Sequence, residues 1–160
     1  MKGIGVKTVL IMFFVTFIAV APTLSKSKDS GGPKAAINQL LVMQAEAWNR
    51  GDLTAFMTGY LDSPDTSYTS GGAEVWGYEA IHARYAKAYG TNSSAMGKLK
   101  FSNLRIVEVG KDSAFCVGQF FLEKPDASKT DGVFSLVLKK TPSGWKIIHD
   151  HTTAGIKKAE

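Results

Sequence analysis

The sequence predicts an α+β fold in which helices come first and an antiparallel sheet follows. Two observations support this prediction. Apolar residues between positions 37 and 48 recur at helical spacing, whereas the chain from Lys98 onward alternates between strand-like segments and short turns. Helices followed by strands are typical of α+β proteins, and strands joined by short turns pair antiparallel. The length of 160 residues fits one domain.

The first helix presents one apolar face, which runs from Ile37 to Trp48. Gly51 is expected to end it, because a left-handed backbone costs glycine little. Asp52 is expected to cap a short second helix over 53–57 by accepting backbone N–H bonds.

The middle of the chain predicts a short strand over 66–70, closed by Gly71 and Gly72, and a third helix over 78–89 that follows Gly77. A polar loop is expected over 125–132. Four longer strands are expected over 99–109, 113–123, 133–140 and 145–152. In the first of them, alternation places Leu99, Phe101, Val107 and Val109 on one face and Leu104 and Ile106 on the other.

The N-terminus predicts export. Lys2 and Lys7 precede an uncharged apolar run over 9–21, which is shorter than the ~20 residues of a membrane-spanning helix. Such a segment is typical of a signal peptide, expected over 1–25, and the alternative is an uncleaved anchor. A flexible leader over 26–33, a domain over 34–153 and a tail over 154–160 would follow. The mature protein would then be periplasmic or secreted, with no membrane association.

Charge and cysteine content argue against a nucleic-acid partner and an internal disulfide. Without residues 1–25 the chain keeps 17 basic and 14 acidic residues, a net charge of +3 without long basic tracts. This argues against a nucleic-acid partner, which needs clustered Lys and Arg. Cys116 is the only cysteine, so no internal disulfide can form, and its apolar neighbours predict a buried position.

Several short motifs, in this order, resemble the SnoaL-like domains of the nuclear transport factor two superfamily. The resemblance covers about residues 34–153. Within the superfamily, the sequence is most similar to a subgroup of exported bacterial domains of unknown function. The motifs are Trp48-Asn49-Arg50-Gly51-Asp52, Phe56-Met57-Thr58-Gly59-Tyr60, Gly77 before Ala80-Ile81, Arg84-Tyr85, Gly118-Gln119-Phe120, Gly132-Val133-Phe134 and 144–152, the stretch Gly-Trp-Lys-Ile-Ile-His-Asp-His-Thr.

The resemblance implies a cystatin-like α+β barrel, in which a strongly curved antiparallel sheet packs against three N-terminal helices and forms a cone with a pocket. It also implies a homodimer, commonly formed sheet to sheet. It does not settle the activity, because this cone hosts isomerases, dehydratases, cyclases and assembly domains. No cofactor is implied.

Two histidines on the last strand are the first candidates for a site. Alternation gives Trp145, Ile147, His149 and His151 one face, which the apolar pair marks as the inner one. Both histidines could therefore contact a ligand or transfer protons, or they could hold the sheet in register. A metal site is not expected, because zinc needs three protein ligands and no third is evident.

Other candidates come from the helices and the first turn. Tyr60 and Tyr68 flank the place where the cone opens, and Arg84 and Tyr85 lie on or beside the apolar face of the third helix. Asp62 is the nearest candidate base, with a turn-capping role as the alternative. The paired acids of the isomerase relatives have no counterpart here.

Three functions follow as hypotheses. The first is an exported dimer that binds a small molecule in its pocket. The second is a cofactor-independent isomerase or dehydratase that acts by proton transfer. The third is an assembly domain, whose pocket would be filled by side chains such as Trp48 and Tyr85.

Overall fold

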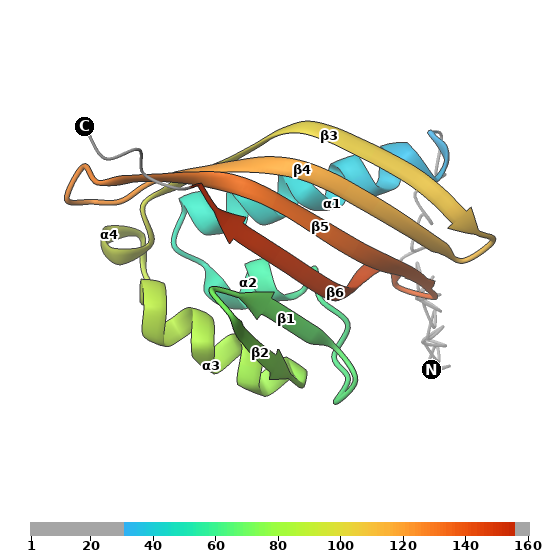
Figure 1. Cartoon of the computed structure of the whole chain (residues 1–160), viewed down its shortest axis with the longest axis horizontal. Helices are drawn as coiled ribbons and strands as arrows, with labels where there is room; N and C mark the ends of the chain where they lie inside the picture. The colour runs from blue at the N-terminus through green and yellow to red at the C-terminus, as the bar shows by residue number, and fades with distance from the viewer. Residues whose placement is uncertain (1–30, 156–160) are drawn as a thin grey trace, which may run out of the picture.

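The computed structural model describes residues 31–155, which form helices followed by one curved sheet (Figure 1). In chain order the elements are α1 (Gly32–Asn49), α2 (Leu53–Met57), β1 (Ser67–Ser70), β2 (Ala73–Trp76), α3 (Tyr78–Tyr89), α4 (Ser93–Met96), β3 (Lys98–Gly110), β4 (Ser113–Glu123), β5 (Lys129–Thr141) and β6 (Gly144–Ala154). The α+β class is confirmed, and the bounds of α2, α3 and β4 coincide with the predicted ones.

The sheet has six strands in the order β2-β1-β6-β5-β4-β3. It curves without closing, and α1 lies along it beside β3 while α3 and the β1–β2 hairpin lie beneath β6 (Figure 1). The buried core lies between these layers and includes Ile37 and Leu41 of α1 and Leu136 and Leu138 of β5.

The corner between α1 and α2 forms as the sequence predicts. Gly51 has a φ of 78°, and the Asp52 carboxylate accepts the Ala55 N–H at 2.9 Å. The side chain of Asn49, the last residue of α1, links this helix to β3. Its amide N–H donates to the Leu99 carbonyl at 3.0 Å, and its amide oxygen accepts the Leu99 N–H at 2.7 Å. Asn49 therefore acts like a further strand partner for the edge strand β3.

Three features of the sheet depart from expectation. Gly71 and Gly72, both at positive φ, form the turn of a hairpin that joins β1 to an unpredicted strand, β2. β1 pairs with β6 in parallel, so the sheet is mixed. β5 begins at Lys129, inside the predicted loop, because its N-terminal residues pair with the end of β4. The helix α4 was also not predicted.

An irregularity in β3 reverses the predicted faces in the second half of that strand. The β3–β4 register shifts between Ser102 and Arg105, where Asn103 has a φ of 52°. An extra residue in a strand turns every following side chain to the other face. Leu104 and Ile106 therefore pack on the core, whereas Val107 and Val109 are exposed, so the predicted grouping of the last two with Leu99 and Phe101 is wrong.

The helix α1 begins at Gly32 and has Pro33 in its first turn. The last two residues of the expected leader are therefore part of this helix. Residues 1–30, which include the expected signal peptide, and residues 156–160 lie outside the described part of the chain. Among the helices of residues 31–155, none has the length and hydropathy needed to cross a membrane.

Candidate functional site

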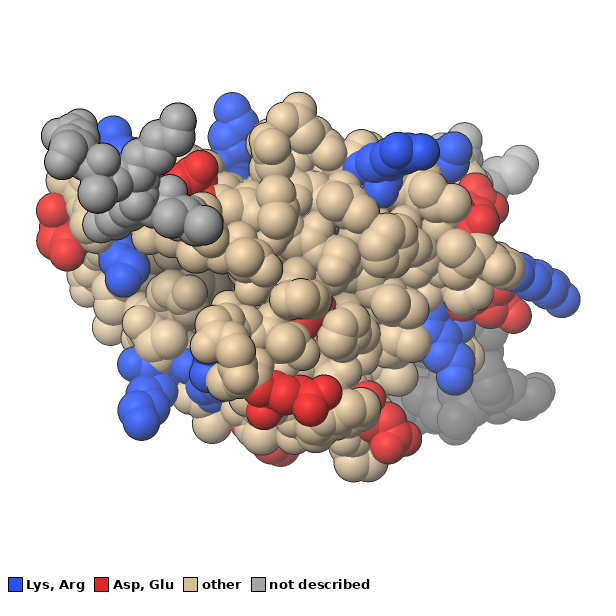
Figure 2. Space-filling model, viewed as in Figure 1, with Lys and Arg blue, Asp and Glu red and all other residues tan. Residues whose placement is uncertain are grey.

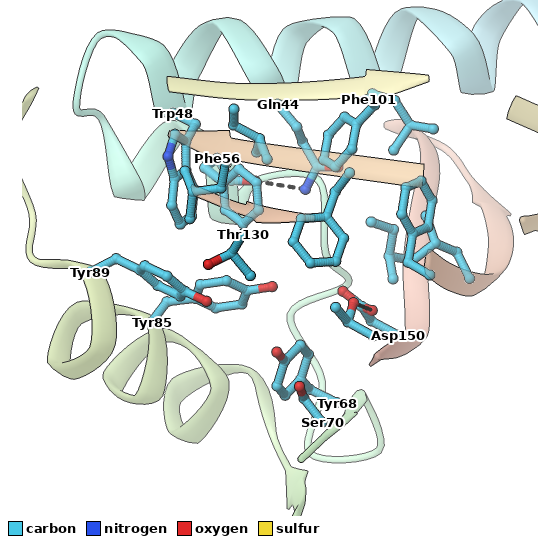
Figure 3. Close-up of a pocket in the computed structure, with 18 of the residues that line it drawn as sticks. Gln44, Trp48, Phe56, Tyr68, Ser70, Tyr85, Tyr89, Phe101, Thr130 and Asp150 are labelled. Atoms are coloured by element: carbon cyan, nitrogen blue, oxygen red, sulfur yellow. Dashed lines mark hydrogen bonds between the residues drawn. The ribbon is translucent and has the colours of Figure 1, made fainter. Parts of the chain in front are cut away.

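A cavity of about 290 Å³ lies between the sheet and the helices (Figure 3). This volume is close to the lower end of the ~300–1,000 Å³ typical of small-molecule sites. Its wall consists mostly of aromatic and aliphatic side chains from α1, α2, α3 and five strands. The lining residues are Leu41, Gln44, Trp48, Phe56, Tyr60, Tyr68, Ser70, Tyr85, Tyr89, Leu99, Phe101, Phe120, Leu122, Lys124, Thr130, Phe134, Leu136, Ile147, Asp150, Thr152 and Ala154.

Tyr85 is the centre of the aromatic part of this wall. Its ring packs against five other aromatic rings, with centroid distances from 5.3 to 6.3 Å, and those rings belong to Trp48, Phe56, Tyr60, Tyr68 and Tyr89. Tilted and edge-to-face contacts of this kind hold rings in fixed orientations. The Tyr85 hydroxyl is therefore held in place where it points toward Asp150 (Figure 3).

Four polar side chains form a hydrogen-bonded group in this apolar wall. The Tyr60 hydroxyl donates to Asp150 Oδ2 at 2.6 Å and lies 3.1 Å from the Tyr85 hydroxyl. The Thr152 hydroxyl donates to Asp150 Oδ1 at 2.8 Å. Asp150 is only 5% exposed, so the cavity holds a buried carboxyl group whose two oxygens both accept hydrogen bonds from the protein.

Burial controls the protonation of this group. Loss of solvent raises the pKa of Asp150, although its hydrogen bonds from Tyr60 and Thr152 and the nearby histidines oppose that shift. Burial first, and the charge of Asp150 second, raise the pKa of both Tyr60 and Tyr85 well above the usual value for tyrosine. Both phenols therefore stay protonated near neutral pH and act as hydrogen-bond donors or acceptors.

The direction of the hydrogen bonds depends on the charge of Asp150. When Asp150 is ionised, Tyr60 donates to it and Tyr85 donates to Tyr60, which leaves the Tyr85 oxygen as an acceptor. When Asp150 is protonated, it can donate to Tyr60, Tyr60 can donate to Tyr85, and the Tyr85 O–H becomes available to a ligand. The same three residues can therefore bind either a hydroxyl or a carbonyl group.

The two predicted histidines lie on the other face of the sheet. The β5–β6 register shifts at Ile148, so that Leu138 pairs with Ile147 while Val137 pairs with His149. This bulge reverses the predicted alternation and turns Asp150 inward in place of the histidines. His151 is exposed, and His149 Nδ1 lies 2.8 Å from the Ser67 hydroxyl. The predicted inward orientation of both histidines is wrong.

The remaining predicted residues divide into two groups. Tyr60, Tyr68 and Tyr85 line the cavity, as the sequence indicated. Asp62 is exposed and lies outside the cavity, which removes it from contact with a ligand there. Arg84 lies beside the cavity, where its guanidinium sits 5.2 Å from the centre of the Tyr68 ring and lines a small adjoining hollow.

Sequence reasoning missed several polar residues of the wall, among them Asp150, Gln44 and Lys124. Asp150 was assigned to the opposite face, and no spacing rule reveals a bulge. Gln44 appeared on the helical face of α1 but was not recognised as a cavity residue. Its amide donates to the Phe56 carbonyl at 3.1 Å. Lys124 follows β4 by one residue, and the alternation of that strand could have found it. Among residues 31–155, no cluster of three His, Cys, Asp or Glu side chains is close enough to hold a metal ion.

The family described as the SnoaL-like domain matches residues 37–156, which span nearly the whole described fold. This chain belongs to the SnoaL-like domain family. No match is found among curated proteins.

Solved structures extend the comparison of this SnoaL-like domain. It is 35% identical to an NTF-2-like protein of unknown function from Shewanella oneidensis MR-1, with a TM-score of 0.70 over 76% of this chain and 98% of that one. A ketosteroid isomerase-like protein from Erwinia carotovora atroseptica is 17% identical, with a TM-score of 0.61 over 75% and 94% of the two chains. A protein of unknown function with a cystatin-like fold from Nostoc punctiforme PCC 73102 is 13% identical, with a TM-score of 0.63 over 78% of this chain and 92% of that one. The last two share the fold alone.

Proposed function

We propose that this SnoaL-like domain binds a small, mostly apolar cyclic molecule through one oxygen atom of that molecule. The observation that carries the proposal is the hydrogen-bonded group of Tyr60, Tyr85 and Asp150 in the wall of an aromatic cavity. A ligand pocket typically combines an apolar wall with a few polar groups that fix orientation.

The cavity also argues for binding rather than for assembly alone. An assembly domain gains stability when side chains fill its core, because a void forfeits packing contacts. Trp48 and Tyr85 line this cavity without filling it, and about 290 Å³ remains open. Burying a carboxyl in such a wall costs stability, which favours a role for Asp150 other than packing.

A second candidate function is proton transfer without a cofactor. Asp150 supports it, because burial raises the pKa of this cavity carboxyl and so favours its acting as a proton donor or acceptor. Tyr85 would hydrogen-bond the substrate oxygen on which charge develops. Asp62, the base expected from the sequence, lies outside the cavity and takes no part.

We also propose that the mature domain is exported and forms a dimer through the outer face of its sheet. Six exposed apolar residues on this face form what we call the outer-face patch: Val107, Val109, Phe115, Val117, Phe121 and Val133. Neighbouring strands carry them, since Phe115 pairs with Val107 and Val137, and Val133 pairs with Gln119. A patch of this kind commonly marks an interface. In the view of Figure 2, most charged side chains lie toward the edges, around a broad area of uncharged residues in which a small patch of acidic atoms shows near the centre.

The binding proposal can be tested by obstructing the cavity. Ala154 lines the cavity near the end of β6, and Thr153 beside it is exposed and does not line it. We expect Ala154→Trp to reduce the binding of neutral bicyclic phenols and ketones, measured by calorimetry, at least tenfold relative to the wild type. Thr153→Trp is the matched control and should bind as the wild type does. Equal binding by both variants would contradict a site in the cavity.

A further inference from the structure

We propose that the natural ligand is elongated and carries an acidic group at one end, which the Lys124 ammonium binds at the mouth of the cavity. This inference rests on the proposed binding function and specifies its ligand class: an amphipathic organic acid, with its apolar body along the aromatic wall.

Lys124 reaches the cavity because it continues the inward face of β4. The buried residues of that strand alternate through Ala114, Cys116, Gly118 and Leu122, and the next position of the same parity beyond Leu122 is Lys124. Inward residues of a strand recur every second position. An aliphatic stem suits such an apolar wall, with the charged end directed toward solvent.

The hairpin between β4 and β5 holds the backbone of Lys124 in place. The Lys124 N–H donates to the Ser128 carbonyl at 2.8 Å, and the Ala127 N–H donates to the Lys124 carbonyl at 2.9 Å. Asp126 is the acid of the turn itself, and its carboxylate accepts the backbone N–H and the hydroxyl of Ser128 at 2.9 and 2.6 Å. This carboxylate is therefore engaged within the turn.

Charge favours an anion at this point. Within residues 31–155, Lys124 is the one basic side chain that lines the large cavity, and it forms no salt bridge there. Arg84 lines the adjoining hollow and stacks on Tyr68, which adds positive charge near the same cavity. The Lys124 ammonium is half-buried and has no salt-bridge partner among the described residues, so it gains a charge-assisted hydrogen bond when a carboxylate binds.

The strand register sets the length of the ligand. Asp150 lies opposite Leu136, and Leu136 lies opposite Cys116. Lys124 is eight residues farther along β4, a backbone separation of roughly 26 Å at about 3.3 Å per residue before the bend of the sheet and the reach of the lysine shorten it. A compact acid cannot contact both ends. A molecule with rings near Tyr85 and a chain toward Lys124 can.

The test uses two probes with the same body and different ends, naphthylhexanoate and naphthylhexanol, titrated by calorimetry. We expect the wild type to bind the acid about five- to tenfold more tightly than the alcohol, since each factor of ten corresponds to ~1.4 kcal/mol. Lys124→Met keeps the length of the side chain without its charge. It should abolish this preference by weakening the acid only.

Lys129→Met is the control, because Lys129 belongs to the same hairpin, is exposed and does not line the cavity. It should keep the preference for the acid. Equal binding of acid and alcohol by the wild type would overturn the inference about the acidic group while leaving the binding function intact. Weakening of both probes alike by Lys124→Met would overturn it too. Failure of both probes to bind the wild type would contradict the binding function itself.

Discussion

Asp150 determines the chemistry of the cavity because it is a carboxyl group enclosed by aromatic rings and aliphatic side chains. Tyr60 and Thr152 each donate one hydrogen bond to it, and Tyr85 extends the group toward the ligand space. Its neighbours on β6, His149 and His151, face the other side of the sheet. A single added residue in β6, at Ile148, produces this arrangement.

The buried carboxyl predicts a pH-dependent stability. Because the folded-state pKa of Asp150 is raised, the folded protein keeps a proton that the unfolded chain has released above about pH 4. The stability that this proton provides is complete below that pH and is lost as the pH rises through the folded-state pKa. Asp150→Asn cannot titrate, so its free energy of unfolding should rise relative to the wild type over that range. Urea unfolding at several pH values measures this difference, and parallel pH profiles would contradict the prediction.

At the scale of elements, the sequence predicted which segments are helices and strands better than it predicted how strands are registered. Caps and glycines define the ends of α2 and α3 through local chemistry, and those predictions are confirmed. The prediction of which side chains of β3 and β6 point to the core was wrong, because each strand contains an irregularity that depends on its pairing with a partner strand. Tyr60, Tyr68 and Tyr85 were placed on the correct side because they lie outside those two strands.

The link between α1 and the edge strand β3 predicts a specific loss of stability. Asn49 makes two side-chain hydrogen bonds to the Leu99 backbone, so Asn49→Ala leaves an N–H and a carbonyl without these partners. We expect the free energy of unfolding to fall by about 1–3 kcal/mol. Asn38→Ala, an exposed change on the same helix, is the control and should be neutral or slightly stabilising. Equal effects of the two substitutions in urea unfolding would contradict this role of Asn49.

At the scale of the whole molecule, the curved sheet separates two environments. Its inner face encloses the cavity, and its outer face carries the outer-face patch beside the two histidines. The sequence resemblance predicted the cone with its pocket and the family, but it could not predict which polar residues line the cavity, because their orientation depends on strand register.

The outer-face patch predicts self-association. The mature domain should sediment as a dimer at micromolar concentration, and Val117→Lys should convert it to a monomer, since a charge on an apolar interface opposes association. Val42→Lys on α1 places the same charge at another exposed valine and should leave the dimer intact. A monomeric wild type in analytical ultracentrifugation would rule out the proposed interface.

The predicted export has its own test. If residues 1–25 are a signal peptide, intact-mass measurement of protein recovered from the periplasm or medium should give a chain that lacks about those residues. Recovery of the chain with its N-terminus intact in a membrane fraction would instead indicate an uncleaved anchor.

The central claim is that the ligand is bound by the buried Tyr60–Tyr85–Asp150 group inside the cavity. Calorimetric titration of naphthol into two variants tests this claim most directly. Tyr85→Phe removes one hydroxyl from that group and should weaken binding about five- to tenfold, the effect of losing a hydrogen bond worth ~1 kcal/mol. His151→Ala changes an exposed side chain on the opposite face and should bind as the wild type does. Weaker binding by His151→Ala, with Tyr85→Phe unchanged, would contradict the account.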